Sequence, residues 1–241
     1  MSLSSQKRAA VVLSGCGYLD GSEIHESVLA LYLLNKHGFE TQCYAPNKAQ
    51  MHTVNHLTRD VYPHQTRNVL EESARIARSA VLALNTLDIA DYDALVLPGG
   101  YGAAKNLSDF ARGNHADGAA DATCVVDSDL EQAITHAFIQ KKPIVAICIA
   151  PVLVAASLHN RGIHAHATLT IGDDANTAAA LEHMGAVHQK CVVTRCIVDT
   201  KNRIITTPAY MYQASLADVG TGIESAIVAL RDMCFSDSLV S

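Results

Sequence analysis

The chain has 241 residues, of which 49% are hydrophobic and 17% are charged, and its formal net charge is -6. This length suits one domain or two small ones, and the composition is that of an ordinary globular protein. The mild acidity without a Lys/Arg cluster argues against nucleic acid or an anionic membrane as the main partner, and no apolar run is long enough for a transmembrane helix.

The first residues, "MSLSSQKRAAVVLSG", place Lys7 and Arg8 before a short apolar run that Gly15 and Gly17 soon interrupt. This run is too short for the hydrophobic region of a signal peptide with its cleavage site. We therefore expect a flexible tail over residues 1–7, followed by a buried strand.

Apolar runs typical of buried strands alternate with segments of helical period along the chain. Strands are expected at residues 8–15, 39–46, 93–100, 142–148 and, around a Lys-Asn turn, twice within 191–210. Helices are expected at 22–38, with Ser22 as a plausible N-cap, and at 129–142 and 222–233. This alternation predicts a parallel sheet covered by helices on both faces. Since no linker or repeat divides the chain, we expect one domain over residues 1–241.

The first of three candidate loops at the carboxyl ends of the strands is "SGCGYLDGSEIHE". Its two leading glycines suggest a dinucleotide fingerprint, but the match is weak because Gly21 stands four residues after Gly17 rather than three. No acidic residue ends the following strand either. The loop delivers Glu23 and Glu26 to a helix start, where each by itself is explained as a partner of the helix dipole.

The second loop, "LVLPGGYGAAKNL", follows an apolar strand with Pro-Gly-Gly. Glycines there permit positive φ and let backbone N–H groups form an anion nest, although a plain tight turn explains the pattern equally well. Asn106 in this segment is either a ligand contact or a helix cap, and the cap is favoured.

The third loop, "KPIVAICIAPVLVAA", places Cys148 where a strand runs directly into a helix. This arrangement is typical of a nucleophile elbow, in which the helix N-terminus favours a thiolate and the N–H of Ile149 faces a developing oxyanion. Most buried cysteines are inert, and none of the seven here has CxxC or zinc-site spacing, so position alone singles out Cys148.

These segments, together with "CYAPNK", "TRNVLEESARIAR", "LTIGDD" and "TTPAYM", resemble the DJ-1/PfpI superfamily and, within it, the ES1 or ElbB-like group of isoprenoid biosynthesis and sigma cross-reacting proteins. The resemblance spans residues from about 8 to 230. It implies a flavodoxin-like three-layer α/β/α sandwich with a mostly parallel central sheet, like that of class I glutamine amidotransferases. Segments 46–80 and 111–125 lengthen the chain beyond a minimal member, and we expect them to cover the crevice or to form an interface.

The resemblance also assigns site residues. Cys148 takes the nucleophile position, and Glu26, or alternatively Glu23, is the glutamate that hydrogen-bonds the thiol. Since a carboxylate beside a thiolate shares its proton, we expect a protonated Glu26 that donates to the Cys148 thiolate near neutral pH. The oxyanion pocket is expected at Gly99, Gly100 and Ile149, and the rim at Glu23, Asn106 and Pro208.

Several residues differ from those of related families, and these differences argue against some of the reactions that the families catalyse. Ile149 stands where protease-like members have histidine, and no histidine begins the His-x-Glu that amidotransferases need, so peptide hydrolysis is disfavoured. His164 and His166 would share one face of an extended segment, but no third ligand is evident and loop histidines are the favoured interpretation. We expect no metal and no cofactor.

The activity that the resemblance implies is a cofactor-independent glyoxalase III reaction on glyoxal or methylglyoxal, dependent on Cys148 and Glu26. One alternative is a non-catalytic stress or redox protein with an oxidisable Cys148. Another is an accessory protein of isoprenoid metabolism, which no residue supports mechanistically. The resemblance further implies a homodimer, located in the cytoplasm or, if the source is a eukaryote, in mitochondria.

Overall fold

A central sheet organises the protein, whose computed structural model describes residues 6–111 and 124–236. The expected tail and the expected insertion at 111–125 lie mostly outside these residues. The seven strands are, in spatial order, β3 (Val81–Ala83), β2 (Phe39–Ala45), β1 (Lys7–Val12), β4 (Ala94–Leu97), β5 (Ile144–Ile147), β9 (Ile204–Thr207) and β8 (Ile197–Asp199). All neighbours pair in parallel except β9 and β8, which form an antiparallel pair around the Lys-Asn turn where two strands were predicted.

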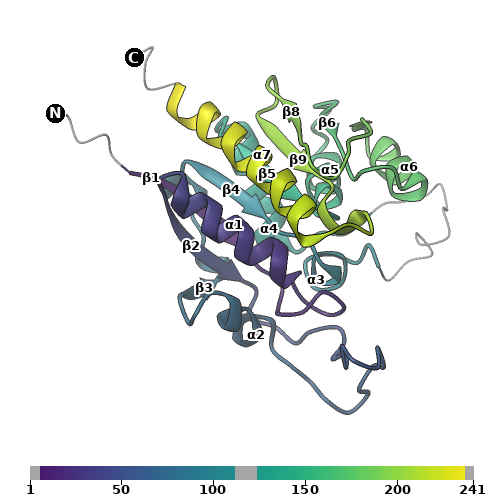
Figure 1. Ribbon diagram of the computed structural model, residues 1–241. Coiled ribbons are helices and arrows are strands. Elements are labelled where there is room, and N and C mark those ends of the chain that lie inside the picture. The colour runs from purple at the N-terminus through teal and green to yellow at the C-terminus, as the bar shows by residue number, and fades with distance from the viewer. Residues whose placement is uncertain (1–5, 112–123, 237–241) are drawn as a thin grey trace.

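Helices cover both faces of this sheet. The α-helices are α1 (Ile24–Lys36), α2 (Val69–Ile76), α3 (Tyr101–Lys105), α4 (Ser128–Ile139), α5 (Pro151–Asn160), α6 (Ala175–His183) and α7 (Leu216–Ser236). Figure 1 shows α1 and α7 side by side on one face, where they share one apolar core with α2. Helices α4 and α5 belong to the core on the opposite face. This is the three-layer α/β/α sandwich predicted from the sequence.

Smaller elements complete the fold. Strands β6 (Thr168–Leu169) and β7 (Val187–His188) form a separate two-stranded sheet beside α6. The 3-10 helices of the described residues include η1 (Leu84–Thr86), η2 (Ile89–Asp91) and η4 (Ala209–Met211), and η4 begins two residues after the end of β9. No helix among the residues that the structure describes has the length and apolar character needed to cross a bilayer.

The start of α1 differs from the expectation. Glu23, not Ser22, is the N-cap, and its carboxylate accepts a hydrogen bond from the Glu26 N–H at 2.7 Å. Ser22 is buried, and its hydroxyl accepts a hydrogen bond from the Ser14 N–H at 2.8 Å instead. The prediction of Ser22 as cap was wrong because its hydroxyl is needed inside the loop after β1.

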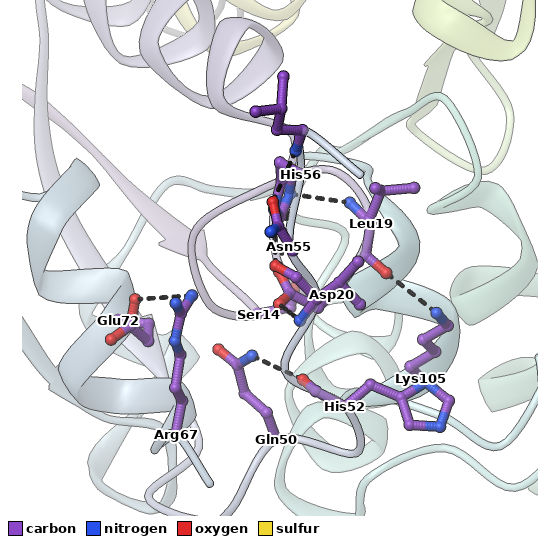
Figure 2. A network of polar contacts seen from close by, with 12 residues as sticks. Ser14, Leu19, Asp20, Gln50, His52, Asn55, His56, Arg67, Glu72 and Lys105 are labelled. Carbon is purple, nitrogen blue, oxygen red and sulfur yellow. Dashed lines mark hydrogen bonds and ion pairs between the residues drawn. The ribbon is translucent and has the colours of Figure 1, made fainter. Parts of the chain in front are cut away.

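Segment 46–80 and α3 both contact the loop that follows β1, residues 14–22. As Figure 2 shows, the Leu19 N–H donates to Nε2 of His56, in segment 46–80, at 3.3 Å, and the Leu19 carbonyl accepts from Nζ of Lys105, in α3, at 2.9 Å. Buried Asp20 accepts from a backbone N–H of the same segment. The segment thereby fixes the course of a loop that leads into α1.

Candidate active site

Cys148 occupies the corner between β5 and α5. Its φ of 61° lies in the left-handed region, which residues other than glycine rarely adopt outside a constrained or functional position. Its N–H donates to the carbonyl of Thr207 at 2.9 Å, which fixes the corner to the neighbouring strand β9. Pro151 opens α5, where its missing N–H costs no hydrogen bond. The strand-to-helix corner expected at Cys148 is therefore present.

Glu26 lies beside this thiol in the first turn of α1. Its side chain is hydrogen-bonded to Cys148, and the residue is fully buried, with 0% of its surface exposed. Its two carboxyl oxygens also accept backbone hydrogen bonds, Oε2 from Gly99 at 3.0 Å and Oε1 from Tyr210 at 3.3 Å. A residue that only complemented the helix dipole would be exposed, so this burial points to a local purpose.

Burial raises the pKa of Glu26 to about 8, and the charge of Glu23 adds to this shift. The hydrogen bonds from Tyr210, Cys148 and Gly99 act in the opposite direction but do not outweigh burial. Glu26 is therefore mostly protonated at neutral pH, as the sequence analysis expects.

The thiol itself differs from the expectation. Burial raises the pKa of Cys148 above its ordinary value, and the adjacent Glu26 raises it further. The N–H groups of Gly100 and Ile149 favour the thiolate, but they do not compensate for the loss of solvent. The resting pair therefore holds a thiol beside a protonated carboxyl, and the thiolate expected at neutral pH is not its main form.

The expected oxyanion donors surround the sulfur. The backbone N–H groups of Gly100 and Ile149 both hydrogen-bond to Cys148, from the turn after β4 and from the first residue after the corner. Gly99, expected in the same pocket, is not a donor there, because its N–H donates to Oε2 of Glu26. It supplies space instead: a Cβ on this residue would lie 2.5 Å from Cβ of Cys148 and 2.7 Å from Oε2 of Glu26. The Pro-Gly-Gly turn therefore belongs to the site rather than being a plain turn.

A cleft of about 390 Å³ opens above the thiol. Cys148, Ile149, Gly100 and Glu23 line its floor and side, as the sequence analysis expects for this edge of the sheet. Aromatic side chains form much of the remaining wall, and none of them was predicted individually because they come from separate loops. These are Tyr18, Tyr101, Phe110 and Tyr210.

Two expected rim residues lie elsewhere. Asn106 is buried at the end of α3 and lies outside the cleft, because its side chain joins three loop positions. Its Nδ2 donates to the carbonyls of Ser14 and Asp20, both at 2.8 Å, and its Oδ1 accepts from the Met51 N–H at 2.9 Å. Pro208 is buried too, and the segment after β9 reaches the cleft through Tyr210 and Met211 instead.

The histidine pair considered for a metal is exposed. His164 and His166 lie in the loop before β6. Within residues 6–111 and 124–236, no group of three or more His, Cys, Asp or Glu side chains is placed to hold a metal ion.

Comparisons with known proteins identify the family, although no family model matches the chain. The mitochondrial ES1 protein homolog of Rattus norvegicus is 40% identical over 235 residues, which cover 94% of this chain and 84% of the rat protein. The chain belongs to the ES1 family. Another relative of this ES1-family chain is the mitochondrial glutamine amidotransferase-like class 1 domain-containing protein 3 of Homo sapiens, 41% identical over 91% of this chain and 81% of the human protein.

Solved structures agree with this assignment. The crystal structure of an isoprenoid biosynthesis protein with an amidotransferase-like domain from Ehrlichia chaffeensis matches with a TM-score of 0.82 and 37% identity, covering 92% of this chain and 98% of that one. Together with the rat and human relatives, this match confirms the prediction of the ES1 or ElbB-like group of the DJ-1/PfpI superfamily. Glyoxalase III from Candida albicans matches with a TM-score of 0.58, but at 13% identity over 93% of this chain and 97% of that one it shows the fold alone.

Proposed function

We propose that this ES1-family chain is a cofactor-independent glyoxalase that converts glyoxal to glycolate and also accepts methylglyoxal. The observation that carries the proposal is the fully buried Glu26 hydrogen-bonded to Cys148, with the N–H groups of Gly100 and Ile149 at the sulfur. Cys148, Gly100 and Ile149 line one cleft, and the proton carrier Glu26 is hydrogen-bonded to Cys148 from the buried side. These are the groups that thiol addition to an aldehyde requires.

The reactive form is the pair that has lost one proton. As the sulfur of Cys148 bonds to one aldehyde carbon, Glu26 retains the remaining proton, and the carbonyl electrons become an alkoxide that Gly100 and Ile149 stabilise. Glu26 then protonates this oxygen and gives a hemithioacetal. A 1,2-proton transfer oxidises this carbon to a thioester and reduces the second carbonyl to an alcohol, so no external oxidant is needed. Water hydrolyses the thioester, releasing glycolate and the thiol.

This scheme predicts a rise of kcat/KM with pH. Because the pKa of Glu26 is raised to about 8, the pair holds both protons below that pH and reacts poorly. We expect kcat/KM for glyoxal to rise by about tenfold per pH unit below pH 8 and to level off above it, because this parameter follows ionisation of the free enzyme. Glycolate formation measured from pH 6 to 9.5 checks this, and a flat profile would show that the pair is already ionised at neutral pH.

The redox-sensor alternative uses the same thiol, but peroxide reacts with thiolates that are accessible. Cys148 is 7% exposed and its pKa is raised by burial, which disfavours oxidation of the resting thiol by peroxide. The deciding experiment measures glycolate formed from glyoxal by NMR and intact mass before and after mild peroxide. Glycolate production supports the proposal, whereas no turnover together with a gain of two oxygens at Cys148 favours the sensor.

Three further expectations remain proposals. We expect a homodimer, which light scattering tests. The relatives from rat and human carry the word mitochondrial in their names; we expect the present protein in mitochondria if its source is a eukaryote and in the cytoplasm otherwise. Participation in isoprenoid metabolism has no support in the geometry of the site.

A further inference from the structure

A second hydrogen-bonded pair of side chains borders the cleft. Tyr210, in η4, lines the cleft that holds Cys148, and its phenol oxygen lies 2.9 Å from Nδ1 of His25. His25 directly precedes Glu26 on α1 and is exposed to solvent. The Tyr210 N–H also donates to Oε1 of Glu26, so Tyr210 is tied to α1 by both its main chain and its phenol.

The surroundings keep this phenol protonated. Burial raises the pKa of Tyr210, and the carboxyl groups of Glu23 and Glu26 raise it further. When Nδ1 of His25 carries a proton, it donates to the phenol oxygen and leaves the O–H of Tyr210 free to donate to a ligand. A neutral phenol held in this way is a preorganised hydrogen-bond donor at the wall of the cleft.

The proposed reaction needs such a donor. The N–H groups of Gly100 and Ile149 lie at the sulfur, where they serve the oxygen of the carbon that the sulfur attacks. Negative charge also develops on the oxygen of the second carbonyl when the hemithioacetal carbon loses its proton. A donor for that oxygen has to come from another part of the cleft.

We propose that Tyr210 is a catalytic residue that donates to the oxygen of the second carbonyl, and that His25 is the positioning residue that orients its hydroxyl. The inference rests on the proposed glyoxalase function. Glu26 removes the C–H proton of the hemithioacetal, the electron pair forms a carbon–carbon double bond, and the second carbonyl becomes an enediolate whose oxygen accepts from Tyr210. Glu26 returns the proton to the second carbon. The hydroxyl proton of the first carbon passes to the oxygen held by Tyr210, which leaves a thioester and a primary alcohol.

The test is Tyr210→Phe, which keeps the aromatic ring and the main-chain N–H that donates a hydrogen bond to Glu26. We expect kcat for glycolate formation to fall by about 10²- to 10³-fold, the usual effect of removing one oxyanion donor. The rate at which iodoacetamide alkylates Cys148 should not change, because the surroundings of the thiol are intact. His25→Leu should lower kcat by about 10-fold, as the loss of an orienting partner does, and His25→Asn should restore part of it.

Tyr32→Phe is the control, since Tyr32 is exposed on α1 and lies outside the cleft; its kcat should equal that of the wild type. If the wild type forms glycolate and Tyr210→Phe is equally active, the inference is overturned and the proposed function stands. If Tyr210→Phe lowers kcat and alkylation alike, Tyr210 is only structural and the inference is also overturned. If the wild type forms no glycolate, the proposed function fails and takes the inference with it.

Discussion

Cys148→Ser is expected to abolish glycolate formation from glyoxal. A serine hydroxyl is a far weaker nucleophile than a thiol, and the same corner geometry then holds a group that cannot form the hemithioacetal. We expect kcat/KM to fall by at least about 10³-fold, as is usual when a covalent nucleophile is removed. Steady-state measurement of glycolate by NMR or an enzyme-coupled assay checks this.

Two companion variants sharpen the result. Glu26→Gln keeps the size of the side chain but cannot carry the proton, and we expect a loss of about 10²- to 10⁴-fold, the usual range for a general acid–base residue. Cys196→Ser is the matched control, since this thiol is partly exposed outside the cleft and its hydrogen bond to Ser225 can be kept by a hydroxyl. Wild-type activity in Cys148→Ser would show that another group attacks the aldehyde.

Gly99→Ala, in the turn after β4, is expected to displace both Cys148 and Glu26. The added Cβ would lie 2.5 Å from Cβ of Cys148, 2.7 Å from Oε2 of Glu26 and 2.9 Å from the carbonyl oxygen of Ile147. Contacts this short force the backbone and the thiol–carboxyl pair apart. Overpacking of this kind costs about 1–3 kcal/mol in the free energy of unfolding, and misplacement of reacting groups by about 1 Å lowers the rate by about 10²-fold.

Denaturant unfolding and glycolate formation, measured on the same preparations, test both parts of this expectation. Gly220→Ala is the control because the nearest atom to the added Cβ, Cδ1 of Leu29, lies at 3.8 Å in ordinary contact. Since alanine favours helices over glycine by about 1 kcal/mol, this variant in α7 should be as stable as the wild type or slightly more stable. Full activity in Gly99→Ala would mean that catalysis does not depend on the spacing between Cys148 and Glu26.

The sheet and the corner could be predicted from the sequence because their signals are local. All residues of β4 and β5 are buried because helices cover both faces of the sheet. Such strands are apolar along their whole length, and this makes them easy to recognise in the sequence. The position of Cys148 followed from the end of one such run. Short elements such as α3, β6 and β7 carry too few residues for a periodic pattern, so they could not be predicted from the sequence.

The surroundings of the thiol depend on side-chain direction and on distant loops. Glu23 and Glu26 both precede or open α1, and the sequence left them as alternatives. Only the structure shows that Glu23 caps the helix while Glu26 points into the core. Asn106 was favoured as a helix cap, and it is the C-cap of α3. Its side chain, however, bonds to loops that no local pattern connects to it.

The contacts of Glu26 have a consequence for how activity appears during folding. This one carboxyl joins α1 to the turn after β4, to the corner after β5 and to η4, whose Tyr210 lies 184 positions away along the chain. Contacts between such distant positions form late, because the intervening chain must first be ordered. A refolding chain can therefore regain most of its helical circular dichroism before it regains any chemistry at the thiol. The rate at which enzymatic activity recovers after dilution from denaturant would then report when η4, in the C-terminal third of the chain, packs against α1.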